Sequence, residues 1–260
     1  MGAELVIVGR SRRRVDATIA DIRRATPAAR VRGMVADLSS QAHVRRLAAE
    51  VLRDVPRLHV LINNAAVVTT RLEESVDGIE RQLAVNHLAS FLLTNLLLER
   101  LAQSAPARVV MVASQVERGA SIDLADLQGR SSYSANRAYG QSKLANILFT
   151  VELARRAADG GVTFISLHPG VYTTRLLDRL LGWNSLVTRL RGRGLPAPEV
   201  GAAVLARAAA DPALDGRGLV HLHEHVIAEP SAQARDRTLA TALWRESARL
   251  TGLATGDDTP

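Results

Sequence analysis

The sequence contains no cysteine, very few aromatic residues and no long apolar run. Without cysteine there is no disulfide, no thiolate catalysis and no cysteine-ligated metal, and we assign no metal-binding residue. A membrane-spanning helix needs about 18 consecutive apolar residues, which the chain never reaches. The short apolar run at 5–8 precedes the basic cluster at 12–14, whereas a secretory signal has the opposite order. We therefore expect a soluble cytoplasmic protein with a mainly aliphatic core, since aromatics make up only 3%.

Lysine is almost absent from a chain that is otherwise basic. There are 33 Lys and Arg residues against 26 Asp and Glu, which gives a net charge of +7, and Lys143 is the single lysine. The arginines are spread among acidic residues, as on solvated surfaces, and stacking aromatics are scarce. These features disfavour nucleic-acid binding. A lone lysine indicates a site where a guanidinium does not serve, and a solvated helix lysine is the alternative.

The order of apolar segments predicts an α/β fold. Helices are expected at 11–25, 39–54, 73–101, 136–158, 198–210 and 231–250, and strands that are apolar throughout at 4–9, 31–36, 58–62, 108–113, 162–167 and 219–222. Buried strands that alternate with helices are typical of a parallel sheet covered on both faces. We predict a Rossmann-like, doubly wound parallel sheet in one domain over residues 1–254. Residues 255–260 are expected to form a polar tail.

Polar or small residues follow every one of the first five strands. Ligands of such sheets bind at the carboxyl ends of the strands, so these residues are candidates for a cofactor crevice. Each is weak alone, because turns are normally polar. They are Arg10, Asp37-Leu38, Asn63-Asn64-Ala65-Ala66, Ser114 and His168-Pro169-Gly170.

The strongest chemical signal is the pair Tyr139 and Lys143. Residues i and i+4 share one face of a helix, and a nearby ammonium lowers the pKa of a phenol towards neutrality. Such a tyrosine can act as a general acid or base. Ser114 can hold a substrate oxygen or be an ordinary turn serine. Asn86, in an apolar stretch, needs hydrogen-bond partners, as a core amide or as the anchor of an ordered water.

These residues resemble the short-chain dehydrogenase/reductase family in order and spacing. The segments at 126–128, 138–149, 167–171 and 243–253 resemble its retinol dehydrogenase branch. The resemblance implies Tyr139 as proton donor or acceptor, Ser114 as holder of the carbonyl oxygen and Asn86 as anchor of the relay water. Lys143 would bind the nicotinamide ribose. The cofactor contacts that the resemblance implies are Asp37, Leu38, Asn64, Ala65, Tyr139, Lys143, Pro169, Gly170 and Thr173.

The chain departs from the family pattern in two places. The Asn-Asn-Ala-Gly motif ends in Ala66. The family's first strand and glycine-rich turn are missing, and neither Gly192/Gly194 nor Gly216/Gly218 follows an N-terminal strand. We expect an N-terminally truncated sheet that has a gap, or closes up, between the strands at Val31 and Leu58. A mis-set start and a genuine loss of cofactor binding both remain open.

The cofactor and substrate follow from the charges and the apolar residues. Arg10 follows the first strand, where an enzyme that prefers NAD carries an acid. A guanidinium there suits a 2′-phosphate, which favours NADP(H) over NAD(H), with a solvated arginine as the alternative. Residues 176–191 occupy the substrate-lid position and have a broad apolar face. They suit a lipophilic alcohol or carbonyl substrate, a membrane surface or packing on the protein's own core.

Three functions therefore stay in view. The first is an NADP-linked dehydrogenase/reductase, and the second is a cofactor-impaired relative that acts as a binding or scaffold protein. The third and weakest is a basic nucleic-acid or membrane binder. The sequence leaves the substrate, the direction of reaction and the formation of a homo-oligomer open.

Overall fold

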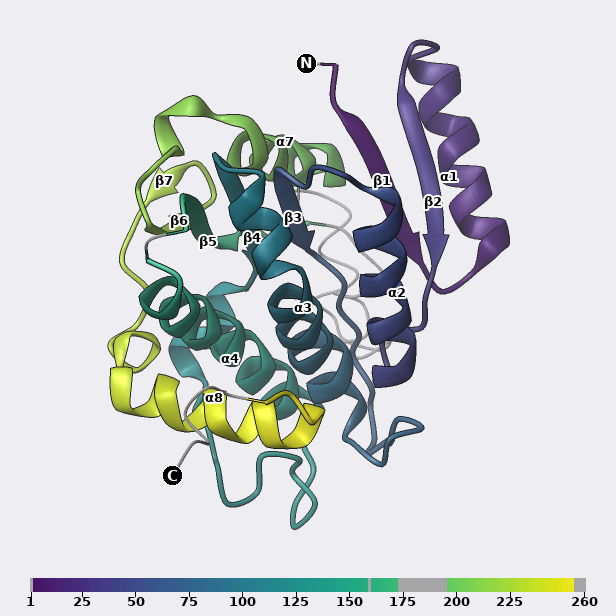
Figure 1. Ribbon diagram of the computed structural model, residues 1–260. Coiled ribbons are helices and arrows are strands. Elements are labelled where there is room, and N and C mark those ends of the chain that lie inside the picture. The colour runs from purple at the N-terminus through teal and green to yellow at the C-terminus, as the bar shows by residue number, and fades with distance from the viewer. Residues whose placement is uncertain (1, 159, 173–195, 255–260) are drawn as a thin grey trace.

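The main sheet has five strands in the order β3-β4-β5-β6-β7 (Figure 1). The computed structural model describes residues 2–158, 160–172 and 196–254. Strands β3 to β6 run parallel in chain order, and only the short β7 is antiparallel. The predicted α/β class and parallel sheet are therefore confirmed. The strands are β3 (Val60–Asn63), β4 (Ala107–Val112), β5 (Val162–His168), β6 (Leu219–His223) and β7 (Val226–Ile227).

The first two strands form a separate parallel pair. β1 (Glu4–Gly9) bonds to β2 (Arg30–Val35) over six residue pairs, and neither bonds to β3. The expected gap is present, but its position was wrong: Figure 1 draws β1, not β2, on the side that faces β3. Large apolar side chains are exposed on both of these strands, with Leu5 of β1 46% and Ile62 of β3 39% exposed.

Helices cover both faces of the main sheet. α3 (Ala89–Gln103), α4 (Ala135–Arg156) and α8 (Arg237–Thr251) pack together on one face, and α7 (Pro198–Ala210) lies on the other (Figure 1). Successive strand residues alternate between two cores because side chains of a strand point to opposite faces. Phe164 joins the core under α3, while Ile165 and Leu167 join the core under α7.

The first two helices flank the β1–β2 pair. α1 (Arg12–Ala25) packs on β2, and α2 (Gln41–Asp54) packs on α3. Ser40 caps α2 by accepting from the backbone N–H of His43 at 3.5 Å, whereas Ser11 precedes α1 without a side-chain cap bond. α2 thus links this N-terminal pair to the rest of the molecule.

Two predicted helices begin later than expected. Residues 73–80 form a turn closed by a bridge between Glu74 and Glu80, with Gly78 at φ +70°, so the helix expected from residue 73 starts only after them. The helix expected over 231–250 begins at Arg237, after the short turn η5 (Gln233–Arg235). Asp236 caps it by accepting from the N–H of Leu239 at 3.0 Å. In both cases turn chemistry interrupts an apolar pattern that resembles a helix.

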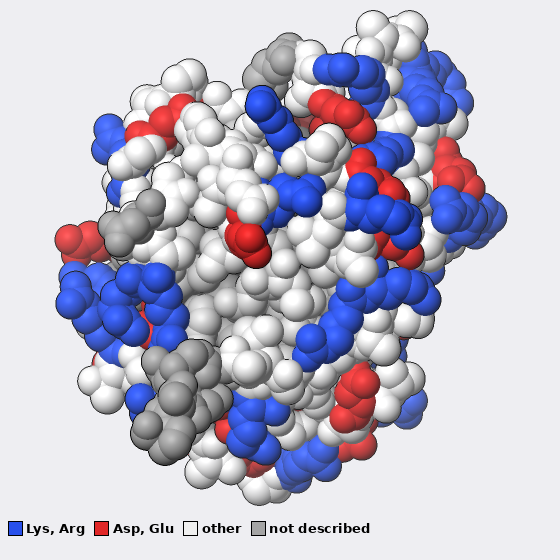
Figure 2. Space-filling model, viewed as in Figure 1, with Lys and Arg blue, Asp and Glu red and all other residues white. Residues whose placement is uncertain are grey.

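Charges of both signs are mixed on the surface. Figure 2 shows basic and acidic side chains interspersed on the face drawn, with many Lys and Arg residues at the upper right, where β2 and α1 lie. Several form helix-surface pairs, such as Arg24 with Asp21 at 2.7 Å. Among residues 2–158, 160–172 and 196–254, no helix combines the length and apolar character required to cross a bilayer.

Candidate active site

A cleft of about 660 Å³ opens at the carboxyl ends of β3, β4 and β5. This is the edge at which parallel sheets bind ligands. The cleft brings together residues that lie far apart in the chain. The sequence-predicted residues that line it are Asn64, Ser114, Tyr139, Lys143, Pro169 and Gly170.

Tyr139 and Lys143 lie one turn apart on α4. Ser134 caps this helix by accepting from the N–H of Arg137 at 3.5 Å. The Lys143 Nζ lies 5.6 Å from the centroid of the Tyr139 ring and donates to the carbonyl oxygen of Val112 at 3.0 Å. Because Val112 is the last residue of β4, this bond fixes the ammonium at the edge of the sheet. The predicted shared face is therefore present.

Burial, rather than the neighbouring ammonium, dominates the acidity of this pair. Tyr139 is 6% exposed and Lys143 2%. Burial raises the pKa of Tyr139 to about 12 and lowers the pKa of Lys143 to about 8, because both charged forms lose hydration. The lowered tyrosine pKa expected from the sequence is wrong for this structure. At neutral pH the phenol is protonated and the lysine is charged.

Ser114 lies two residues after β4 and caps the short helix η2 (Gln115–Gly119). Its Oγ accepts from the N–H of Val116 at 3.5 Å. Gly140, beside Tyr139, allows α4 to approach this segment closely, because a Cβ there would lie 3.2 Å from the Cβ of Ala120. The contact between α4 and η2 therefore sets the spacing between Ser114 and Tyr139.

Asn86 lies in a π-helical segment, η1 (Leu83–Leu88), that leads into α3. Its Oδ1 accepts from the N–H of Val67 at 2.7 Å, and its Nδ2 donates to the carbonyl of Val67 at 3.1 Å and to the Oγ of Ser142 at 3.0 Å. Asn86 is buried and is not among the residues that line the cleft. The structure thus shows a core amide that joins η1 to α4 and to the loop after β3.

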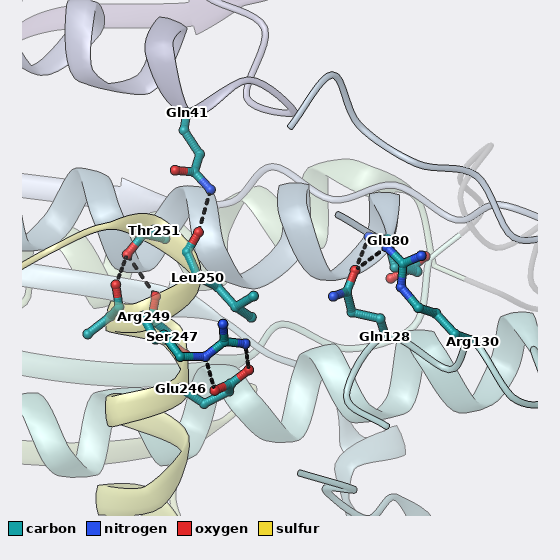
Figure 3. Close-up of polar contacts among 10 residues, drawn as sticks. Gln41, Glu80, Gln128, Arg130, Glu246, Ser247, Arg249, Leu250 and Thr251 are labelled. Carbon is teal, nitrogen blue, oxygen red and sulfur yellow. Dashed lines mark hydrogen bonds and ion pairs between the residues drawn. The ribbon is translucent and has the colours of Figure 1, made fainter. Parts of the chain in front are cut away.

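The loop at 123–131 holds the start of this helix. Gln128 accepts from the backbone N–H of Glu80 at 3.1 Å through its Oε1, as Figure 3 shows. The Glu80 carboxylate in turn accepts from the N–H groups of Gln82 and Leu83 at 2.9 and 2.6 Å. The predicted motif at 126–128 therefore has a structural role that the sequence did not reveal.

The C-terminal helix braces the site from the other side. Gln41 of α2 donates to the carbonyl of Leu250 in α8 at 2.7 Å (Figure 3). Further along α8, Ser247 bonds the Nε2 of His87 at 2.9 Å, one residue beyond Asn86. The segment at 243–253, singled out in the sequence, thus anchors α2 and η1. These bonds are buried or half-buried, so they fix α8 against α2 and against η1, which carries Asn86.

The residues expected at the adenosine end belong to a different part of the molecule. Arg10 follows β1, and Asp37 and Leu38 follow β2, so they lie on the separate strand pair. Burial alone would raise the pKa of Asp37, but hydrogen bonds from the N–H and Oγ of Ser39 and the charges of Arg81 and Arg10 together lower it. Asp37 therefore forms a local turn, and Ser40 is the helix cap.

One remaining prediction has no contact in the cleft, and others fall outside the described residues. Ala65 is exposed and does not line the cleft, whereas its neighbours Asn64 and Ala66 do. Thr173, the segment at 176–191, Gly192, Gly194 and the tail at 255–260 lie outside the described residues.

Helix α7 forms one wall of the cleft, which the sequence did not predict. Pro198, Gly201 and Leu205 line it. Gly170 has φ +106°, and a Cβ there would lie 2.4 Å from the hydroxyl oxygen of Tyr172, while a Cβ at Gly201 would lie 2.5 Å from its ring. Both glycines are therefore required by the packing of Tyr172. The helix itself was predicted, and its alanine- and leucine-rich face was the available signal.

Comparison with known proteins places this site in context. The sequence matches the family model described as short chain dehydrogenase over residues 1–184. Retinol dehydrogenase 11 from Homo sapiens is 41% identical over 222 residues, which cover 84% of this chain and 68% of that protein. Polyprenol dehydrogenase from Mus musculus is 40% identical over 266 residues, which cover 99% of this chain and 79% of that protein.

Solved structures agree with these matches. A crystal structure of an uncharacterised protein from Mycobacterium paratuberculosis is 35% identical, with a TM-score of 0.75, and the alignment covers 96% of this chain and 85% of that chain. A structure described as an NAD(P)-dependent gluconate 5-dehydrogenase from Beutenbergia cavernae, with bound NADP, is 26% identical with a TM-score of 0.64. That alignment covers 86% of this chain and 85% of that chain.

Proposed function

The chain belongs to the short-chain dehydrogenase family, in its retinol dehydrogenase-like branch, and from this premise we propose that it interconverts a lipophilic alcohol and its carbonyl with NADP(H). Family membership makes it an oxidoreductase that acts on CH–OH groups of a small molecule, with an NAD(P) cofactor. The proposal adds the residues, the preferred nucleotide and the substrate class.

One observation carries the proposal. Ser114 from the end of β4 and the pair Tyr139 and Lys143 from α4 line a single cleft at the sheet edge. A hydroxyl, a phenol and a buried ammonium at one place are the groups required to hold a carbonyl oxygen and to protonate it.

Each side chain has a distinct part in the reaction. The cofactor supplies a hydride for carbonyl reduction and accepts one in alcohol oxidation. Tyr139, whose phenol is protonated at neutral pH, gives its proton to the carbonyl oxygen during reduction, and its phenolate form accepts the alcohol proton during oxidation. The Ser114 hydroxyl donates to the same oxygen. Lys143 holds its charge beside the phenol.

Asn86 is the proposed anchor of a water that returns the proton to solvent. Its Nδ2 uses both donors, on Val67 and Ser142, and its Oδ1 accepts one bond, from Val67. An amide oxygen has a second lone pair, which is the position that such a water requires.

The residues present fit the nicotinamide end of the cofactor. The Lys143 ammonium donates one hydrogen bond, to the carbonyl of Val112. Because an ammonium has three N–H donors, two can reach ribose hydroxyls. Gly170 lines the same cleft. For the pyrophosphate, the described residues offer no glycine-rich turn: Gly216 and Gly218 precede β6, at the opposite edge of the sheet. The fit is therefore partial.

NADP(H) is favoured by the charges beside β1. Arg10 is exposed, and its charge reaches Asp37 together with that of Arg81. Two guanidinium groups near the proposed adenosine position suit a 2′-phosphate.

A lipophilic substrate is supported by the composition of the cleft. Its α7 side carries Pro198, Ala202 and Leu205, and Val116 and Val171 add further apolar atoms. The relatives retinol dehydrogenase 11 and polyprenol dehydrogenase are named for long apolar alcohols. An apolar wall orients such a chain and leaves its oxygen beside Ser114 and Tyr139.

The test is a Tyr139→Phe variant, assayed with NADPH and aldehydes of increasing chain length, in the chain extended by an upstream strand, glycine-rich turn and helix from a close relative. We expect turnover to fall by at least about a hundredfold, since proton transfer is worth roughly 10²–10⁴ in rate, and kcat/KM of the parent to rise with chain length. The control is Tyr133→Phe, because Tyr133 bonds Thr69 and Gln82 outside the cleft. Near-normal turnover of Tyr139→Phe would refute the proposed role.

A further inference from the structure

Three side chains of types that can bind metal ions meet at the carboxyl ends of β5 and β6, and one of them, His168, also lines the cleft. They are His168, His223 and Glu224, and one ligand atom of each lies within 4.8 Å of those of the other two. The strand register explains the meeting. His168 of β5 pairs with His223 of β6, so their side chains lie on the same face, and their ring centroids are 4.8 Å apart. Ser166 and His221, two residue pairs earlier, bond each other at 2.8 Å.

Two further observations distinguish this cluster from ordinary surface histidines. The Nδ1 of His168 is buried and has no hydrogen-bond partner among the described residues, although buried polar atoms normally have one. Glu224 has φ +54°, the sole positive φ among the described non-glycine residues. It is the first residue of a two-residue hairpin loop, where glycine or asparagine is usual. The backbone is therefore strained at Glu224, whose carboxylate lies beside two imidazoles.

From this geometry we propose that His168, His223 and Glu224 form a binding site for a divalent cation of the zinc class. Two imidazoles and one carboxylate are a ligand set that zinc accepts, with a fourth position left for water. Ligand atoms around a tetrahedral zinc lie about 3.4 Å apart, given bond lengths of about 2.0–2.2 Å. The cluster therefore needs to contract by roughly 1 Å, which rotation of the exposed Glu224 side chain allows.

The bound cation would connect the cluster to the cleft. The N–H of Glu224 already donates to the carbonyl of His168 at 2.7 Å. Pro169 and Gly170, which line the cleft, follow His168 directly. A cation there would brace the turn on which these two residues lie. This site is outside the proposed proton-transfer machinery, so the two proposals can fail separately.

The spacing of the histidines at 221–225 indicates part of this cluster. Residues 221–225 read His-Leu-His-Glu-His, in which alternate histidines of a strand share one face. The absence of cysteine excludes thiolate ligands, but it does not exclude histidine or carboxylate ligands. The strand pairing that brings His168 opposite His223 could not be derived from this pattern.

The experiment is a zinc titration of the chain, purified without a polyhistidine tag and freed of metal by a chelator. Competition with a chromophoric chelator should show one zinc per chain with micromolar or tighter affinity. His223→Ala and Glu224→Gln should each weaken binding by at least about tenfold. His225→Ala is the matched control, because His225 is exposed in the same loop and outside the cluster, and it should leave affinity within about twofold.

Cobalt gives an independent readout. Co²⁺ in the site should show the visible absorption of a four-coordinate ion, and His223→Ala should abolish it. Zinc should also raise the melting temperature of the parent chain and not of His223→Ala, since a ligand of the native state stabilises it. Absence of binding, or equal loss in His225→Ala and His223→Ala, would overturn the proposal, because the latter shows only a histidine-rich loop.

Discussion

Lys143 carries a stability cost that its proposed function explains. A buried ammonium is unfavourable, and burial lowers its pKa from 10.5 to about 8. Between these two values the unfolded chain binds more protons than the folded one, so stability rises with pH across this window. Below pH 8 the whole penalty is present.

Lys143→Met should therefore stabilise the protein at pH 7. The shift of pKa corresponds to a gain of up to about 3 kcal/mol, reduced by roughly 1 kcal/mol for the lost bond to the Val112 carbonyl. Urea denaturation at pH 7 and pH 10.5 measures it. The advantage of the variant over the parent should shrink at the higher pH, and an advantage that does not change with pH would contradict the argument.

Arg10 decides the nucleotide in our proposal. Arg10→Glu should weaken NADPH through like-charge repulsion and affect NADH less, so the ratio of their dissociation constants should change by at least about tenfold. Arg24→Glu, at the far end of α1, makes the same change in net charge and should leave the ratio alone. If both variants behave alike, Arg10 does not contact the 2′-phosphate.

At the scale of helices and strands, the buried segments were predictable and the interrupted ones were not. β1 and α7 match their expected bounds because composition changes sharply at both ends. The segment at 73–80 continues the apolar pattern but turns at Gly78, where positive φ overrides periodicity. The expected lowering of the Tyr139 pKa was wrong for a different reason. The i,i+4 spacing places Lys143 correctly, but the degree of burial, which raises this pKa, depends on the whole fold.

The site was predictable where it follows strand ends. Ser114 and Gly170 each come two residues after the end of a strand, β4 and β5, so a parallel sheet brings them together. The wall of the cleft formed by α7 depends on tertiary packing, and the meeting of His168, His223 and Glu224 depends on strand register. A single sequence specifies neither. Asn86 was singled out as a buried amide that needs partners, and the structure supplies Val67 and Ser142.

The contact between α4 and η2 offers a test of how elements position the site. Gly140→Val should press on Ala120, destabilise the protein by about 1–3 kcal/mol and lower kcat, because it separates Ser114 from Tyr139. Gly119→Ala is the matched control in η2, where an added Cβ meets nothing within 4 Å. Thermal unfolding and kcat are the measurements. Unchanged kcat in Gly140→Val would show that this spacing is not critical.

At the scale of the molecule, the division of the sheet bears on cofactor binding. The residues proposed for the adenosine end, Arg10, Asp37 and Leu38, follow the strands of the β1–β2 pair. Those proposed for the nicotinamide end, such as Tyr139 and Lys143, line the cleft of the main sheet. We predict that the chain as printed binds NADPH weakly, because charge-assisted bonds to a pyrophosphate are worth about 1.5–3 kcal/mol each. Calorimetry with NADPH is the measurement.

A graft supplies the control for this prediction. An upstream strand, glycine-rich turn and helix from a close relative should restore both NADPH affinity and activity. Micromolar binding without the graft would mean that another loop holds the phosphates. Failure of the graft to restore either property would favour the second candidate, a relative that binds or scaffolds without catalysis.

The single lysine also makes the protein a natural reporter of its own opening. Acylating reagents at mildly alkaline pH modify deprotonated amines, and Lys143 is the one side chain in the sequence that offers them a target. Its burial closes that route while α4 stays against β4. The acylation rate at residue 143, followed by mass spectrometry, would therefore record how often the reactive centre is exposed to solvent. A bound nucleotide should slow it, and no engineered label is required.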